Sequence, residues 1–394
     1  MDARSHERAR SPHHGLVIAA RSLFCVLVPL SLVGAVAGGL LRACTAPPPP
    51  TLPSWIAAAA LSHAALMICG FLGSVVALER AVAVGRGAAF LAPLASGLGG
   101  ALLLAGQVRA AAFAIVAAAA VFVVVNIVLV RRQRAAHTRL LLGGAVAWLV
   151  GSALYAGGAN GPAVLPWWFA FLVATIAAER LEMTRLTGRG LAVERSLRLV
   201  MATLFGGAVV ASFSAAMGAA LFGTALVLLA AWLFLHDIAR RTLFTHGLSR
   251  YMAVCLLTGY GWLAAAGVGW IGMGAGLPLH DLALHALGLG FVVSMMMAHA
   301  PVILPAIARV RLRFGWAFYV PLVALHVSLV VRLGPGLGLG DALVRGLGAT
   351  LNAASLALFA ATIAGAVLAW RLMHAGEEAA RAGARRRRPA SRLH

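Results

Sequence analysis

Histidines within strongly apolar stretches are the residues of this sequence whose type and position favour chemistry. His63 lies in the stretch 55–78, and His285 and His299 lie in the stretch 280–305. An ionisable side chain inside a membrane span is costly, so such a residue is by default a functional hypothesis. A neutral imidazole can offer a lone pair to a metal, or it can donate a hydrogen bond to a backbone carbonyl of a neighbouring helix. Both interpretations stay open for any one of these histidines.

His63 and His285 are expected at a similar depth, which favours a shared role. His63 follows the start of its stretch by about 12 Å of helix, and His285 follows His280 by about 8 Å. Glycines come next on both stretches, and small residues let a flat group approach the backbone closely. Two facing imidazoles above apolar walls predict a haem b site, with His63 and His285 as the cofactor-binding metal ligands.

The other histidines and the acidic residues have weaker functional signals. His299 is a further cofactor-binding candidate, and with His326 it would form a second site toward the other membrane face. Loop histidines such as His137 are expected to be solvated, and Asp237 is expected at the membrane interface. The dipeptides Glu79-Arg80 and Glu179-Arg180 end two spans that lie four spans apart, which is either a weak internal repeat or two structural ion pairs.

Composition places these residues in a polytopic membrane protein. The 394 residues are 62% hydrophobic and 11% charged, far from the balance of a soluble domain. A span needs about 20 apolar residues, and this length predicts an all-α bundle of about twelve transmembrane helices. The expected spans are 18–41, 55–78, 88–106, 108–130, 140–158, 163–179, 197–217, 219–237, 251–271, 280–305, 316–333 and 342–370.

The arginines predict the orientation of these spans. All 32 basic residues are arginine, and cytoplasmic loops accumulate basic residues. With a cytoplasmic N-terminus, only Arg42, Arg109, Arg332 and Arg345 fall on the outer side. We therefore expect both termini in the cytoplasm, with residues 1–17 as a basic N-terminus, 18–370 as the transmembrane domain and 371–394 as a disordered basic tail. The net charge of +21 then indicates anionic lipid, and not nucleic acid, as the partner.

These features resemble a known family of haem proteins. Twelve spans with histidines in the outer parts of spans 2 and 10 resemble subunit I of the haem–copper oxidases. The sequences Ser62-His63-Ala-Ala-Leu-Met67 and His285-Ala-Leu-Gly288 are more similar to the NnrS-type membrane proteins. That resemblance implies a haem-copper-oxidase-subunit-I-like bundle in the bacterial inner membrane, a role in nitric oxide or respiratory physiology, and a partner from one of those systems.

The chain also departs from these patterns. Residues 163–218 contain no histidine, although an oxidase places copper ligands on spans 6 and 7. The NnrS-type pattern His-Ala-His-Glu-Met is reduced to His63 alone, with no acidic residue before Glu79. These departures argue against oxygen reduction and against copper. Whether the protein is an enzyme at all stays open.

Two other classes of function compete with a haem protein of this type. Twelve spans are common among secondary transporters of small solutes, which bind near the bilayer midplane. Asn126, His326 and Asn352 are the polar candidates for such a site. A non-catalytic assembly factor or sensor would use the same fold without turnover. The colour of the purified protein distinguishes the transporter from the other two.

Overall fold

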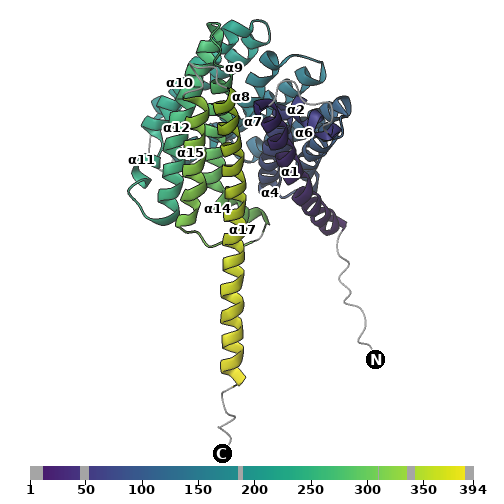
Figure 1. The fold of residues 1–394 in the computed structure, drawn as a ribbon, viewed down its shortest axis with the longest axis vertical. Coiled ribbons are helices and arrows are strands. Elements are labelled where there is room, and N and C mark those ends of the chain that lie inside the picture. The colour runs from purple at the N-terminus through teal and green to yellow at the C-terminus, as the bar shows by residue number, and fades with distance from the viewer. Residues whose placement is uncertain (1–11, 45–52, 185–189, 309, 335–341, 387–394) are drawn as a thin grey trace, which may run out of the picture.

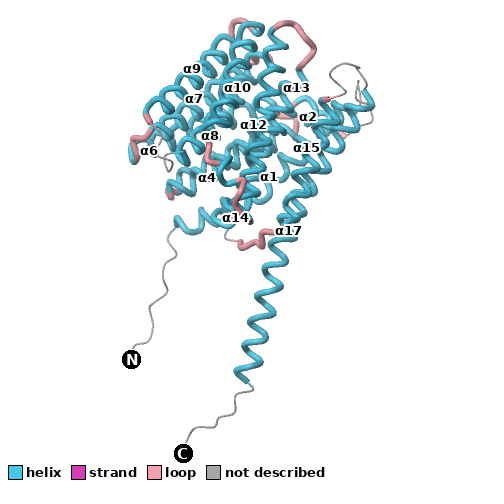
Figure 2. The backbone as a smooth tube through the Cα atoms, turned by 90° about the vertical axis from the view of Figure 1, so that its left-hand side faces the viewer, coloured by secondary structure: helices cyan, strands magenta, loops and turns pink. Residues whose placement is uncertain are grey.

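A computed structural model describes the whole chain except residues 1–11, 45–52, 185–189, 309, 335–341 and 387–394. The described part is a helical bundle without strands (Figure 1; Figure 2). The first half contains α1 (Pro12–Cys44), α2 (Ser54–Leu61), α3 (His63–Ala65), η1 (Leu66–Gly73), α4 (Ser74–Val84), η2 (Gly87–Phe90), α5 (Leu91–Leu104), α6 (Val108–Arg132), α7 (Ala136–Ala156) and α8 (Gly161–Thr184). The second half contains α9 (Leu191–Ala211), α10 (Ala215–His236), α11 (Ala239–Thr242), α12 (Gly247–Gly274), α13 (His280–His285), η4 (Ala286–Val293), α14 (Ser294–Ala308), η5 (Trp316–Phe318), α15 (Tyr319–Leu333) and α17 (Ala342–Arg386).

The structure confirms a polytopic helical membrane protein. Among the described residues, 11 helices are long and apolar enough to cross a bilayer. The predicted span 197–217 is the exception, because its helix α9 begins earlier, at Leu191, and carries Glu194, Arg195 and Arg198 in its first turns. α9 nevertheless packs along α10 and α8. All twelve predicted spans therefore correspond to helical segments, one of which has a charged beginning.

The last helix is longer than expected. α17 has 45 residues, about 67 Å at the rise of an α-helix, whereas a hydrocarbon core is about 30 Å thick. It continues as helix past residue 370, where the last span was predicted to end, and Figure 1 shows its C-terminal part projecting far beyond the bundle. Its apolar part packs against α15 and α1, so the first and last spans are neighbours.

Spans 2 and 10 share an unusual local structure. In each, the histidine lies at or near the start of an eight-residue π-helical segment, which is η1 after His63 and η4 after His285. Both segments contain two glycines, and Ser74 and Ser294 follow them. π-helical turns are rare in proteins, and those that occur often lie at functional sites. The sequence analysis did not predict these segments.

An aromatic cluster fixes span 2 against its neighbours. Trp148 of α7 stacks on Phe171 of α8 with ring centroids 4.8 Å apart, and Phe122 of α6 contacts both rings edge-on. The indole of Trp148 also donates to Sγ of Cys69 in η1 at 3.4 Å. A Cβ at Gly73 would lie 2.8 Å from the same indole, so span 2 packs closely against the core just beyond His63.

Candidate functional site

His63 is held from span 1. The helix is interrupted at Ser62 (φ −103°, ψ 13°), and His63 begins α3. Its Nδ1 donates a hydrogen bond to the carbonyl of Ala35 in α1 at 2.7 Å. A Cβ at Gly39 would lie 2.7 Å from the imidazole, so this glycine makes room for the ring. With the proton on Nδ1, Nε2 carries the lone pair, and no described residue hydrogen-bonds to it.

His285 is held by its own helix and by α15. Its Nδ1 lies 2.8 Å from Oδ1 of Asp281, one turn earlier, and 3.1 Å from the carbonyl of the same residue. Arg332 binds both carboxylate oxygens of Asp281, at 2.8 and 2.9 Å. The guanidinium also donates to Nε2 of His285 at 3.2 Å. A carboxylate on Nδ1 of a histidine fixes the tautomer with an Nε2 lone pair, as in many metal-ligating histidines.

The bundle brings the two predicted histidines together. His63 and His285 are near enough that their charges would repel each other if both were protonated, and Arg42 and Arg332 are the other charged neighbours of His63. Arg42 also donates to the carbonyl of Ala60 at 3.3 Å, which ties the end of α1 to α2. A Cβ at Gly288, one turn after His285, would lie 3.8 Å from the Phe169 ring, an ordinary van der Waals distance. The site is therefore a pair of oriented imidazoles flanked by two arginines.

His299 lies in a different environment. Its Nδ1 donates to the carbonyl of Met295 at 2.7 Å, and its Nε2 accepts from Arg180 at 2.9 Å. Its charged neighbours are Glu79, Arg180 and Asp237, none of which neighbours His63. His299 follows His285 by about 20 Å of helix. The structure therefore places His299 in a second polar cluster, away from the other two predicted ligands.

His326 does not join His299. The indole of Trp262 donates to its Nδ1 at 3.0 Å, and its Nε2 lies 3.0 Å from the hydroxyl of Thr258. Both partners belong to α12, and both imidazole nitrogens are occupied. The interpretation as a hydrogen-bonded structural histidine fits His326, and the second site imagined between His299 and His326 is not formed.

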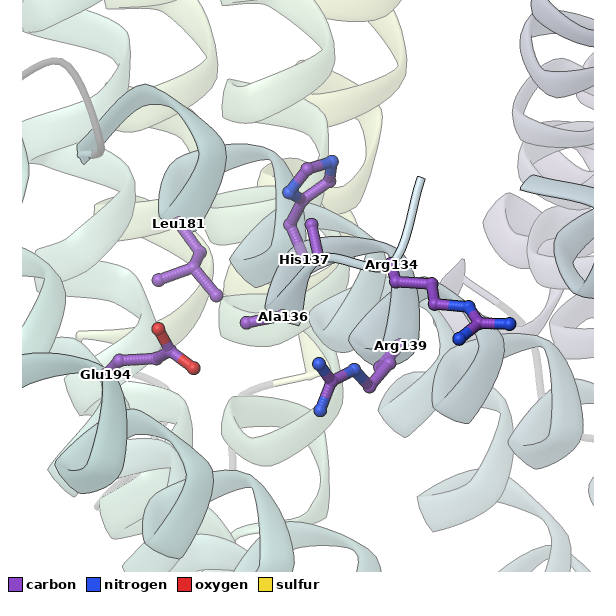
Figure 3. Close-up of a pocket in the computed structure, with 7 residues that line it drawn as sticks. Arg134, Ala136, His137, Arg139, Leu181 and Glu194 are labelled. Carbon is purple, nitrogen blue, oxygen red and sulfur yellow. The ribbon is translucent and has the colours of Figure 1, made fainter. Parts of the chain in front are cut away.

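Two other polar residues are more buried than expected. Asp237 is 2% exposed, and its Oδ1 accepts from the amide of Ala239 at 2.7 Å, so it is buried within the bundle. His137, expected in solvent, is 5% exposed and lies 3.8 Å from Glu182 of α8. It borders a cavity of ≈ 260 Å³ between α7, α8 and α9, which Figure 3 shows with Glu194 and Arg134 on opposite sides.

The donor set at the His63–His285 pair suits a haem better than a bare metal ion. Within the described ranges, no group of three or more His, Cys, Asp or Glu side chains is placed to hold a metal. Haem iron already has four porphyrin nitrogens and takes only its axial ligands from the protein. Two imidazoles with anchored Nδ1 groups supply those ligands, provided that Arg332 releases Nε2 of His285.

The sequence analysis missed Asp281 and Arg332 as parts of this site. Asp281 precedes His285 by four residues, which places the two side chains on one helix face and was a usable signal. Arg332 was recognised only as one of four outer arginines. Its contact with Asp281 spans α13 and α15 and depends on tertiary packing, which residue spacing does not encode.

Comparison with known proteins identifies a family but no characterised relative. The family described as Domain of unknown function (DUF8744) matches residues 21–368, which includes nearly all of the transmembrane region. Neither a curated protein nor a solved structure matches the chain.

Proposed function

The chain belongs to the DUF8744 family, a domain of unknown function, and we propose that it is a haem b-binding membrane protein with His63 and His285 as axial ligands. The observation that carries this proposal is the matched orientation of the two imidazoles. In each, Nδ1 is tied to an acceptor, Ala35 for His63 and Asp281 for His285, so each Nε2 carries a lone pair. The two residues come from different spans and are electrostatic neighbours.

The surrounding residues have distinct roles in this proposal. Asp281 keeps the proton of His285 on Nδ1 and raises the basicity of Nε2. Arg42 and Arg332 provide positive charge for the two carboxylates that haem b carries. Gly39 leaves room for the His63 ring, and a Cβ at Gly288, one turn after His285, would meet the Phe169 ring at an ordinary contact distance of 3.8 Å. A bound haem would supply one-electron chemistry and a site for small gaseous ligands.

The physiological setting follows from the resemblance to NnrS-type proteins. We propose a role in nitric oxide response or respiration at the bacterial cytoplasmic membrane, with both termini in the cytoplasm. Residues 163–218 carry no histidine for a copper centre of the oxidase kind, so we expect no sustained oxygen reduction. Asn352, one of the polar candidates for a transporter, instead hydrogen-bonds to Ser328 and Arg332 within the bundle.

A visible spectrum tests the proposal directly. The full chain, purified from haem-replete cells in detergent, should give the reduced-minus-oxidised spectrum of a b-type haem. The amount of haem, measured after conversion to its pyridine adduct, should be about one per chain, because one pair of axial histidines holds one haem. A colourless protein would reject the haem proposal and leave the transporter as the leading alternative.

A further inference from the structure

The second polar cluster is centred on two carboxylates that share one arginine. Nη2 of Arg80 on α4 lies 2.5 Å from Oε1 of Glu179 on α8 and 3.3 Å from Oε1 of Glu79, its neighbour in sequence. The side chains of Glu79 and Glu179 are 27% and 23% exposed, and that of Arg80 is 14% exposed. Arg80 of span 2 therefore lies closer to Glu179 of span 6 than to Glu79 of its own dipeptide.

A deeper group of side chains adjoins this pair. Arg180 is 5% exposed and donates to Nε2 of His299, and its Nη1 lies 4.0 Å from Oδ2 of Asp237. Tyr260 of α12 is 2% exposed and has Asp237 and Arg180 as charged neighbours. His299 in turn is a charged neighbour of Glu79. The groups that face the two glutamates thus come from α4, α8, α10, α12 and α14.

Three polar atoms in this deeper group form no hydrogen bond in the described part of the chain. They are Nε of Arg180, Oδ2 of Asp237 and the hydroxyl of Tyr260, all on side chains that are at least nine-tenths buried. Buried polar atoms are nearly always hydrogen-bonded to protein or to ordered water. The hydroxyl of Tyr260 lies near enough to Asp237 to donate to it, so Nε of Arg180 is the buried donor that still needs an acceptor such as an ordered water.

The formal charges of the cluster do not cancel. Arg180 and Asp237 neutralise each other, and both nitrogens of His299 are occupied in the neutral form. Among the residues that the structure describes, Arg80 is the one cation within ion-pair distance of Glu79 and Glu179, so these three side chains carry one negative charge in excess when both carboxyl groups are ionised. Unpaired charge is costly away from water, and two carboxylates that share one site do not both ionise readily.

We propose that Glu79 holds an exchangeable proton at neutral pH beside the Arg80–Glu179 ion pair, so that this end of the bundle is a proton-binding site. The proton comes from water and resides on a carboxylate oxygen, which makes the pair, with Arg80, electrically neutral. An alkali cation is a poorer occupant, because hard cations take six or more oxygen ligands. The site is separate from the histidine pair, since Glu79 follows His63 by about 24 Å of helix.

Infrared difference spectroscopy of the purified full chain in lipid nanodiscs tests this assignment. The wild type should show the carbonyl stretch of a protonated carboxylic acid at pH 7, and the band should shift in D₂O. Glu79→Gln and Glu179→Gln should each abolish it, because the remaining carboxylate then has Arg80 to itself. Glu182→Gln is the matched control, since Glu182 is three residues from Glu179 on α8 and 49% exposed; it should retain the band.

Other outcomes would overturn the proposal. No protonated carboxylic acid in the wild type at pH 7, or a band that survives both substitutions, means that the pair is fully ionised. Loss of the band when choline chloride is replaced by sodium chloride would assign the site to a metal cation. Glu79→Asp keeps a carboxyl group and should move the band without removing it, which preserves the test if Glu79→Gln does not fold. None of these readouts depends on haem.

Discussion

Arg332 donates a hydrogen bond to Nε2 of His285 at 3.2 Å while it binds both carboxylate oxygens of Asp281. The nitrogen proposed to ligate iron is therefore already an acceptor in the protein without cofactor. For His285 to ligate iron, Nη2 of Arg332, which also binds Oδ1 of Asp281, would have to release Nε2, while the contact of Nε with Oδ2 of Asp281 can remain. The arginine thus has a structural role that is separable from ligation.

Substitution of the histidine pair should remove or alter the haem. In His63→Ala or His285→Ala, one axial nitrogen is lost, so we expect loss of the haem or conversion of a low-spin to a high-spin spectrum. His326→Ala is the control, because both nitrogens of His326 are occupied by Trp262 and Thr258. Visible spectra of the three variants, recorded at equal protein concentration, show which substitutions change the haem. A pair of unchanged spectra for His63→Ala and His285→Ala would reject these ligands.

Replacement of Arg332 should affect stability more than haem content. Arg332→Gln breaks the bidentate contact with Asp281, and loss of a partner in a partly buried polar contact costs about 1–3 kcal/mol. We expect a lower melting temperature in detergent and only a modest loss of haem, because both imidazoles and Arg42 remain while one positive charge beside the haem carboxylates is removed. Arg345→Gln, at an exposed residue on the same side of the predicted topology, should melt like the wild type. Equal melting of both variants would contradict a structural role for Arg332.

A methyl group at Gly38 should disturb the packing that supports His63. A Cβ there would lie 2.3 Å from the carbonyl oxygen and 2.4 Å from the carbonyl carbon of Ala59 in α2. Backbone atoms cannot rotate away, so Gly38→Ala should destabilise the fold by about 1–3 kcal/mol, as overpacking does. Gly261→Ala, where the Cβ meets nothing within 4 Å, is the control. Thermal unfolding monitored by tryptophan fluorescence compares them.

Reporter fusions test the predicted orientation. Gly158 and Gly276 lie in loops after α7 and α12, with φ of 81° at both, and should be outside. Ala135, before α7, and Gly247, at the start of α12, should be inside. The alternation requires α9 to cross the membrane despite its charged first turns. A reversed location at any two positions would refute the topology.

Hydropathy was sufficient for the helical class and for eleven of the twelve predicted spans, because the bilayer demands long apolar runs whatever the tertiary structure. It overestimated the apolar character of α9, because Glu194 and Arg195 lie just before the predicted span 197–217 and Arg198 lies within it. The proximity of His63 and His285 followed from depth alone. Depth along one helix does not reveal contacts between helices, so the pairing of Arg332 with Asp281 and of Arg80 with Glu179 was not predicted.

His299 is a case in which sequence proximity suggested a contact that the structure does not form. Its presence in the same apolar stretch as His285 suggested a shared cofactor, but the length of the helix separates them. The buried position of Asp237 also escaped detection, since a residue at the end of an apolar run is normally solvated. Its burial depends on α11 and α12 folding back beside α8, which no local pattern encodes.

Because of the π-helical segments, the directions in which the later side chains of spans 2 and 10 point depend on the exact number of residues in each segment. A turn closed by an i→i+5 hydrogen bond contains one residue more than an α-helical turn, and each residue of an α-helix advances by about 100°. Deleting one residue from η1 or η4 would therefore rotate everything beyond it by roughly a quarter turn. Glu79 and Arg80 would turn together away from Glu179, and His299 would turn away from Arg180. The two π-helical segments thus set the rotation of the later part of each span, so that both the histidine pair and the cluster around Glu179 and Arg180 face the interior of the bundle.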